Sequence, residues 1–251
     1  MNILINGYGR MGREIESILL ERGDHVCARI DVSGFGDYKS LTKELLIDLK
    51  PDGVIEFAGS DCVVENARMC SSLKIPVIVG TTGWNDRVDE VKKIIESNDS
   101  AYLYGSNFSI GAHMFFSIVE KAAAMINPLP EYDIFMSEYH HNKKVDSPSG
   151  TALTTAEKII KNNNRKTTII KDALNRQIEE HELHVASVRG GYIHGTHTVM
   201  MDSIADTIEI THRARNRKGF AMGSILAAKW LIGKQGFYRV EDYINDLFKE
   251  E

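Results

Sequence analysis

The sequence has few of the features that mark secreted, metal-stabilised or membrane-inserted proteins. It contains three cysteines, Cys27, Cys62 and Cys70, an odd number without C-x-x-C spacing. A disulfide framework or a zinc site is therefore not expected, and a reducing cytoplasm is the expected compartment. No signal-peptide pattern is found, and no apolar stretch approaches the roughly 20 residues of a membrane span.

Charge of one sign is also not in large excess. The net charge is −5, from 30 Lys and Arg against 35 Asp and Glu, so neither nucleic acid nor an anionic membrane is expected as a partner. The 43% hydrophobic and 26% charged fractions are those of an ordinary globular protein, and 251 residues suffice for one large or two small domains. The H-E-x-x-H pattern of zinc hydrolases is missing, so no metal site is predicted.

The first motif that is present is a glycine-rich turn. A short apolar run, 3–5, is typical of a parallel strand covered on both faces. Gly7, Gly9 and Gly12 follow it as G-x-G-x-x-G, and apolar residues at helical spacing come next. Strand, turn and helix are the context of a dinucleotide fingerprint, because the glycines let the backbone approach a pyrophosphate at a helix N-terminus. An accidental glycine turn is the alternative.

An acidic residue ends the next predicted strand, 25–30. Asp31 lies about 20 residues beyond Gly12, which is the spacing of the acid that accepts hydrogen bonds from an adenosine ribose. A strand-end Asp that caps the following turn is the alternative. Because an acid here repels a 2′-phosphate, NADH should bind at least as well as NADPH, although Arg10 or Lys39 could favour the phosphate.

Strands and helices then alternate as far as residue 104, which predicts right-handed crossovers and an α/β, Rossmann-type doubly wound parallel sheet. Two of the strands end in polar loops, 80–84 and 105–108. Ligands bind at such strand ends, so the small, hydroxyl and amide side chains of these loops could contact ribose and nicotinamide. Plain turn chemistry is the alternative for both loops.

The second half of the chain is different in character. Strand-like segments dominate from 132 to 212, and Gly190-Gly191 followed by a strand at 192–201 indicates a hairpin. We expect a second, α+β domain that carries an open mixed sheet, with a face suited to packing between subunits. Helical patterns at 220–231 and 240–248 could return to cover the first sheet.

The stretch 138–153, E-Y-H-H-N-K-K-V-D-S-P-S-G-T-A-L, is where the chemistry is expected. It combines His140, His141, Lys143, Lys144 and Asp146 with a helix N-terminus that follows directly. A proton donor beside unpaired helix N–H groups suggests a small acidic substrate. His184 and His212 could line the same cleft. A solvated basic loop is the alternative.

Together these motifs resemble the 4-hydroxy-tetrahydrodipicolinate reductase (dihydrodipicolinate reductase) family over essentially the whole chain. The most specific segment is H-H-N-K-K-V-D-S-P-S-G-T, and other matching segments are G-T-T-G at 80–83, S-N-F at 106–108, V-R-G-G at 188–191 and I-T-H-R-A at 210–214. The chain departs from the family at Asn6, where many members begin the glycine loop. It departs again at Glu56-Phe57-Ala58, which lacks the usual hydroxyl.

The resemblance implies reduction of a small cyclic dicarboxylate with NADH or NADPH by a homotetramer. It implies a dinucleotide-binding domain, 1–108 with 220–251, and a substrate-binding and oligomerisation domain, 109–219. By position, His140 matches a proton donor/acceptor and Lys144 a proton donor, whereas Lys143 and Asp146 match no assigned role. The substrate-binding positions are His141, Gly150 and Thr151. The cofactor-binding positions are Gly7, Tyr8, Gly9, Arg10, Met11, Gly12, Asp31, Gly80, Thr81, Thr82, Gly105, Ser106, Asn107 and Phe108.

Two other functions compete with this one. The chain could be an NAD(P)-dependent oxidoreductase of another small carboxylate, because a fold alone does not set the substrate. It could also be a Rossmann protein that senses NAD(H) without catalysis, although sensing needs no proton donor.

Overall fold

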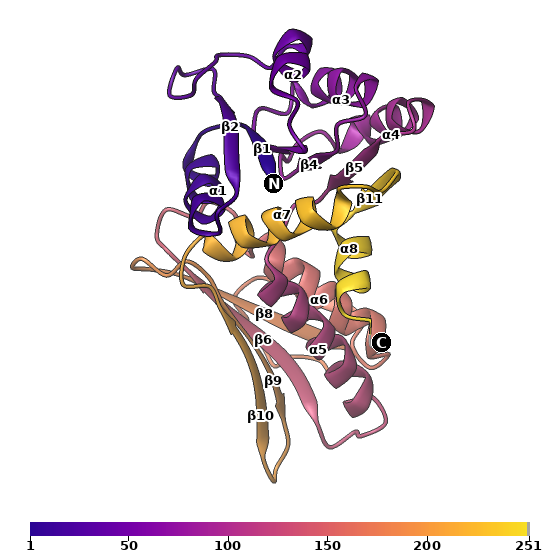
Figure 1. The fold of residues 1–251 in the computed structure, drawn as a ribbon. Helices are drawn as coiled ribbons and strands as arrows, with labels where there is room; N and C mark the ends of the chain where they lie inside the picture. The colour runs from indigo at the N-terminus through magenta and orange to yellow at the C-terminus, as the bar shows by residue number, and fades with distance from the viewer. Residues whose placement is uncertain (250–251) are drawn as a thin grey trace. The chain divides into compact units, whose positions relative to one another are not determined.

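The computed structural model describes residues 1–249. The chain forms two compact units (Figure 1). Unit 1 consists of Met1–Ile110 and Arg217–Glu251, and unit 2 consists of Gly111–Asn216. In the described part of the chain, no helix is long and apolar enough to cross a membrane.

Unit 1 contains a six-stranded sheet whose neighbouring strands are all parallel, in the order β11-β5-β4-β3-β1-β2. This confirms the predicted Rossmann-type sheet. Its central strands are short apolar runs because both of their faces are covered. The strands are β1 (Asn2–Asn6), β2 (His25–Ile30), β3 (Gly53–Glu56), β4 (Val77–Val79), β5 (Ala101–Tyr104) and β11 (Gly236–Arg239).

Helices cover both faces of this sheet (Figure 1). On one face, α1 and α7 pack against each other and their buried side chains share a core with β1, β3 and α8. On the other face, α2, α3 and α4 form a second core. The helices are α1 (Arg10–Glu21), α2 (Lys43–Leu49), α3 (Val63–Ser72), η1 (Asn85–Arg87), α4 (Val88–Ser97), α7 (Lys218–Leu231) and α8 (Val240–Leu247).

The glycine turn after β1 is held by a close backbone contact. Gly7 has φ +94°, which disfavours other residues, and a Cβ on it would lie 2.3 Å from the carbonyl oxygen of Phe57. The loop that follows β3 therefore packs directly against the glycine turn, and only glycine fits between them.

Unit 2 contains a five-stranded mixed sheet in the order β10-β9-β6-β8-β7, in which β6 and β8 are parallel and β9 is antiparallel to both of its neighbours. Helices α5 and α6 pack on one face, where alternate residues of the strands form a third core. The elements are α5 (Ile110–Ile126), β6 (Asp133–His140), α6 (Gly150–Asn162), β7 (Thr168–Ile170), β8 (Glu182–Arg189), β9 (Thr196–Asp202) and β10 (Thr207–Arg213).

The structure corrects three expectations from the sequence. The predicted hairpin at Gly190-Gly191 is wrong, because β6 lies between β8 and β9 in the sheet. The strand expected over 192–201 begins only at Thr196. In addition, β11 was not predicted, because its four residues adjoin a helix. His184 precedes Val185, which is buried on the helix side of the sheet, so strand alternation places His184 on the opposite face from His140.

A fully buried glutamate lies at the end of β3. Its Oε2 accepts hydrogen bonds from Asn6 Nδ2 at 2.9 Å and from Asn66 Nδ2 at 2.8 Å, and its Oε1 has no partner among the described residues. Burial raises the pKa of Glu56 to about 7, and the two amide donors oppose that rise. Asn6, one of the departures from the family pattern, thus ties β1 to β3.

Glu56 should make folding stability depend on pH. The folded protein holds a proton on Glu56 more tightly than the unfolded chain does, so this contribution is present below about pH 4.5 and is lost as the pH rises through 7. Glutamine cannot ionise. The Glu56→Gln variant should therefore gain about 2 kcal/mol relative to the wild type between about pH 5.5 and pH 8.5, measured by urea unfolding. The exposed Glu65→Gln is the control, and parallel pH dependences of E56Q and wild type would contradict the prediction.

Candidate active site

The glycine turn of unit 1 leaves its helix N-terminus open to a ligand. Helix α1 begins at Arg10 after Gly9, and no side chain caps it. A Cβ on Gly9 would meet nothing within 4 Å, whereas a Cβ on Gly12 would lie 2.4 Å from the Gly7 carbonyl oxygen. The turn is therefore closely packed at Gly7 and Gly12 and open at Gly9, which is the form a backbone phosphate cradle needs.

Three further residues of the turn have different environments. The hydroxyl of Tyr8 donates to Glu16, which also binds Arg29 at 2.6 Å from its Nε, so this ring is held in place. Arg10 is exposed, and Met11 packs partly against the core of unit 1.

Asp31 caps a turn, as the alternative interpretation of this residue expects. Its Oδ1 accepts hydrogen bonds from the backbone N–H of Ser33, at 2.9 Å, and from the Ser33 hydroxyl. The hydroxyl bond is the largest influence on Asp31 and lowers its pKa, so the side chain carries a negative charge. Both bonds reach the same oxygen, and capping therefore does not occupy Oδ2.

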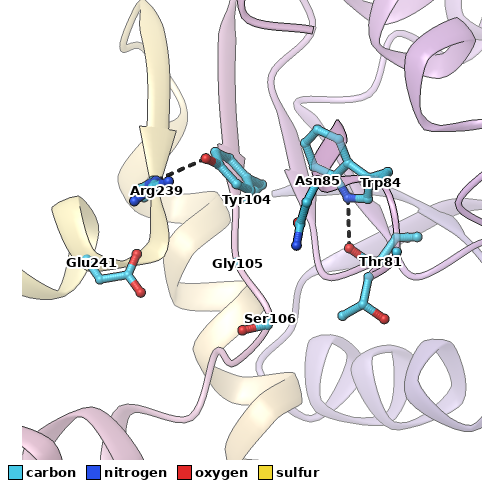
Figure 2. A pocket seen from close by; sticks show the side chains of 10 residues that line it. Thr81, Trp84, Asn85, Tyr104, Gly105, Ser106, Arg239 and Glu241 are labelled. Atoms are coloured by element: carbon cyan, nitrogen blue, oxygen red, sulfur yellow. Dashed lines mark hydrogen bonds between the residues drawn. The ribbon is translucent and has the colours of Figure 1, made fainter. Parts of the chain in front are cut away.

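A cavity of about 350 Å³ lies at the carboxyl ends of β4, β5 and β11 (Figure 2). In Figure 2, Arg239 and Glu241 lie on one side of it, Asn85 and Trp84 on the other, and Ser106 below Tyr104. The lining residues are Thr81, Thr82, Gly83, Trp84, Asn85, Tyr104, Gly105, Ser106, Arg239 and Glu241.

Two hydrogen bonds hold the walls of this cavity. Trp84 Nε1 donates to the Thr81 carbonyl oxygen at 2.9 Å, and Arg239 Nε donates to the Tyr104 hydroxyl at 3.0 Å. The fold thus gathers predicted cofactor positions from both loops, together with residues that the sequence did not indicate. Arg239 was missed because the strand that places it, β11, was missed.

Other predicted cofactor positions serve the scaffold in this structure. Gly80 lies against Phe57, whose ring would be 2.1 Å from a Cβ at that position. The Asn107 side chain accepts a hydrogen bond from Ser109 N at 2.9 Å, and the Phe108 ring is buried beside Phe57 in an edge contact of 6.3 Å. The open turn at Gly9, the uncapped α1 and the polar cavity together fit a dinucleotide.

In unit 2, His140 ends β6 and is buried beside a fully buried carboxylate. Glu138 lies two residues earlier on the strand, so both side chains point to the same face of the sheet. His140 Nδ1 is 3.1 Å from Glu138 Oε2, although the ring N–H is not aimed straight at that oxygen. At this distance the carboxylate acts on the ring electrostatically, without an aligned hydrogen bond.

The Glu138 carboxylate receives donors from two other parts of unit 2. Oε1 accepts from Ser149 N at 3.0 Å, Ser187 Oγ at 2.9 Å and Arg189 Nη2 at 2.7 Å, and Oε2 accepts from the Ser149 hydroxyl. Desolvation acts to raise the pKa of Glu138, but hydrogen bonds from His197, Ser149 and Arg189 outweigh it and hold the pKa far below its usual range. Glu138 therefore stays ionised.

His197 on β9 completes the group. Its Nε2 lies 3.5 Å from Glu138 Oε2 and 3.2 Å from Ser149 Oγ, and its ring stands edge-on to His140 at 5.2 Å. Glu138, His140 and His197 are close enough together to hold a metal ion. The Arg189 guanidinium is already bound to the same carboxylate, and this positive charge makes the group unsuitable for a divalent cation.

The pKa of His140 is lowered to about 4. Desolvation is the main cause, the Glu138 charge opposes it, and the charges of His197, Lys144 and Arg189 reinforce it. His140 is therefore a neutral imidazole near pH 7, able to accept a proton.

Lys144 and Asp146, in the loop after β6, form an ion pair at 2.8 Å between Nζ and Oδ1. The hydrogen bond from Lys144 lowers the pKa of Asp146. The Asp146 carbonyl oxygen accepts from Arg189 at 2.7 Å, so the loop is tied to the same guanidinium as Glu138. Lys143 is exposed and makes no hydrogen bond or ion pair among the described residues.

The predicted substrate-binding residues flank this loop. His141 donates its backbone N–H to the Ile193 carbonyl oxygen at 2.7 Å. Gly150 and Thr151 open α6, whose N-cap Ser149 accepts from Ala152 N at 3.2 Å. These residues are thus held at one end of the sheet, beside His140.

Sequence reasoning missed the residues that surround the Glu138 carboxylate. The spacing of Glu138 and His140 on one strand was a usable signal, because i and i+2 share a face. His197, Ser187 and Arg189 reach the group through the register of β9 and β8 with β6, which no local pattern encodes.

Comparisons with known protein families agree on one family. Residues 1–108 match the family model described as "Dihydrodipicolinate reductase, N-terminus", and residues 111–244 match "Dihydrodipicolinate reductase, C-terminus". The 4-hydroxy-tetrahydrodipicolinate reductase of Christiangramia forsetii is 38% identical, over 99% of this chain and 100% of that protein. That of Methanoregula boonei is 34% identical, over 97% of each chain.

Solved structures show the same fold. Dipicolinate-bound dihydrodipicolinate reductase from Paenisporosarcina sp. TG-14 superposes with a TM-score of 0.77 at 21% identity, covering 96% of this chain and 98% of that one. A probable dehydrogenase from Thermotoga maritima gives a TM-score of 0.56 at 13% identity, covering 98% and 93%.

The neutral state of His140 can be tested by titration. Because burial disfavours the imidazolium, the ring should take up a proton with a midpoint of about 4, well below the ordinary 6.5. Histidine NMR chemical shifts followed from pH 8 downward would measure the midpoint, and a His140→Asn variant would assign the resonance. A midpoint at or above 6.5 would refute this environment.

Proposed function

Since this chain belongs to the dihydrodipicolinate reductase family, we propose that the residues around His140 supply the proton side of the family's reaction. The protein is an oxidoreductase that reduces 4-hydroxy-tetrahydrodipicolinate with NAD(P)H in lysine and diaminopimelate biosynthesis. The observation that carries the residue assignment is the placement of a neutral imidazole and a lysine ammonium at the end of β6 and in the loop that follows.

The cofactor side of the reaction belongs to unit 1. The nicotinamide of NAD(P)H supplies a hydride when bound. Gly9 and the open N-terminus of α1 would hold the pyrophosphate, Asp31 the adenosine ribose, and the loops at Thr81–Thr82 and Gly105–Ser106 the nicotinamide end. The negative charge of Asp31 favours NADH over NADPH, because it repels a 2′-phosphate. The exposed cation Arg13 acts on Asp31 and could offset that repulsion.

The proton side of the reaction belongs to unit 2. A carbon that receives a hydride, or the atom conjugated to it, needs a proton as negative charge develops. Lys144 carries a proton as an ammonium and can deliver it, and the neutral His140 accepts a proton from solvent or returns one to Lys144. A dianionic substrate would raise the pKa of His140 by direct attraction, so binding would favour its protonated form.

The substrate is a small dicarboxylate, and unit 2 offers groups for its two charges. The amide groups at Gly150 and Thr151 stand at the N-terminus of α6, where the helix dipole favours an anion. The imidazole of His141 and the Lys144 ammonium provide further donors. Asp146 pairs with Lys144 in the free protein, so a substrate carboxylate would replace that partner.

The two competing functions fit the structure less well. A sensor of NAD(H) gains nothing from a buried glutamate, a histidine and a lysine assembled beside a helix N-terminus. A reductase of a different small carboxylate would differ from the proposed enzyme only in its substrate, so an assay with the proposed substrate decides between them.

The proposed compartment is the cytoplasm. The support is chemical: Cys27, Cys62 and Cys70 are all free thiols, which is the usual state in a reducing compartment.

The proposed assembly is a homotetramer in which sheets of unit 2 face one another. Helices α5 and α6 cover one face of this sheet, and strand alternation leaves the other face to apolar side chains such as Phe135, Tyr139, Val188 and Met200. Tyr139 and Val188 are 39% and 46% exposed. Large apolar side chains gathered on an open sheet are typical of subunit interfaces.

Lys144→Ala should separate catalysis from cofactor binding. Turnover of substrate, prepared freshly from pyruvate and aspartate semialdehyde, should fall by roughly two to four powers of ten because the proton donor is lost. NADH binding, followed by fluorescence titration, should not change. The matched control is Lys143→Ala, which should retain turnover; normal turnover in K144A would contradict the assignment. Failure of the wild type to oxidise NADH with this substrate would overturn the function itself.

Met200→Lys should weaken the assembly without unfolding unit 2. In the sheet Met200 is opposite Glu209, so a lysine gains an opposite charge across the strands, yet its ammonium would be buried in a sheet-to-sheet interface. Sedimentation velocity should show a tetramer for the wild type and for Ile47→Lys, whose side chain lies exposed on α2. M200K should sediment as a smaller species. A monomeric wild type would exclude the proposed interface.

A further inference from the structure

We infer that Glu138 is a positioning residue for the reaction, which holds the His140 ring so that its Nε2 is the atom that exchanges a proton. This inference rests on the proposed role of His140. It concerns a residue that touches neither substrate nor cofactor and acts only through the imidazole.

The geometry that supports it is local to one strand and its two neighbours. Glu138 and His140 share a face of β6, which brings Oε2 to 3.1 Å from Nδ1. A carboxylate this close favours a proton on Nδ1 over one on Nε2, because a lone pair on Nδ1 would be repelled by the negative charge, whereas a proton there is attracted even without a straight hydrogen bond. The neutral ring is thus biased toward the Nδ1–H tautomer, and its Nε2 carries the lone pair.

The surroundings of Nε2 agree with a proton on Nδ1 and a lone pair on Nε2. A Cβ on Gly195 would lie 2.9 Å from Nε2, and Gly195 has φ +150°. The backbone before β9 therefore passes close to this nitrogen without any side chain over it. A larger residue at 195 would cover the atom that is inferred to exchange the proton.

Glu138 holds the ring without acting as a base. Arg189 at 2.7 Å, Ser187 at 2.9 Å and the backbone N–H of Ser149 at 3.0 Å are all bound to Oε1. These donors keep the carboxylate ionised and immobile, so a proton that reaches His140 is not transferred to Glu138. The Arg189 guanidinium also binds the Asp146 carbonyl oxygen, so the same network fixes the loop that carries Lys144.

The charged and titratable groups around His140 come from four segments. Glu138 precedes it on β6, His197 comes from β9, Arg189 from β8 and Lys144 from the following loop. Glu138 is the only member of this group that attracts a proton to His140, and the other three oppose protonation. Removing its charge should therefore alter both the tautomer and the ease of protonation of His140.

The first measurement is made on the wild-type protein, and a variant is needed only to assign the signal. Long-range proton–nitrogen NMR of histidine-labelled protein at about pH 7.5 distinguishes the two tautomers, and His140→Asn identifies the signal. We expect the Nδ1–H tautomer for His140. The Nε2–H tautomer would overturn the inference.

The second measurement is a double-mutant cycle. Glu138→Gln keeps the size of the side chain and removes its charge, and should lower kcat roughly 100-fold with little change in NADH affinity. In a His140→Asn background the same substitution should lower kcat by less than about twofold, because its effect passes through the imidazole. The matched control is Glu182→Gln, another buried glutamate on β8 that pairs with Arg176 at 2.6 Å and should leave kcat unchanged.

The outcomes separate this inference from the proposed function. Full activity of His140→Asn alone would overturn the assigned role of His140 and the inference with it. If His140→Asn is impaired and E138Q lowers kcat by the same factor in both backgrounds, only the positioning role is overturned. Glu138 would then be structural. A loss of kcat in E182Q equal to that in E138Q would also count against a specific action through His140.

Discussion

The buried charge of Glu138 is the interaction on which the candidate active site depends. An ionised carboxylate without solvent is costly unless donors surround it, and the four donors here come from the start of α6 and from β8. The same charge attracts the His140 ring and, through Arg189, is connected to the loop that carries Lys144. One electrostatic requirement thus arranges both proposed proton carriers.

Unit 1 depends on a different constraint, the close approach of two backbone segments. Gly7 allows the turn after β1 to lie against the backbone at Phe57, and Glu56, the residue before it, is tied to β1 by Asn6. The turn at Gly9, the proposed phosphate cradle, is therefore supported by the end of β3. Two of the departures from the family pattern, at Asn6 and at Glu56-Phe57-Ala58, lie in this support.

The protonation states divide the proposed chemistry between two residues. Burial leaves His140 uncharged, whereas Lys144 has a carboxylate partner that a dianionic substrate could replace. A neutral acceptor and a cationic donor together permit a proton to be delivered and then restored. Neither residue alone provides both functions.

The sequence by itself was enough for the alternation of strands and helices from β1 to β5, the glycine turn and the segment that carries His140 and Lys144, because these depend on local patterns and on family resemblance. It missed β11, the last strand of the sheet in unit 1. Only the tertiary structure placed β6 between β8 and β9, which removed the expected hairpin and brought Arg189 and His197 to Glu138. Such contacts depend on strand register, a non-local property set by how the faces of the sheet are buried. The sequence therefore indicated the proposed reacting groups, and the fold decided which charges surround them.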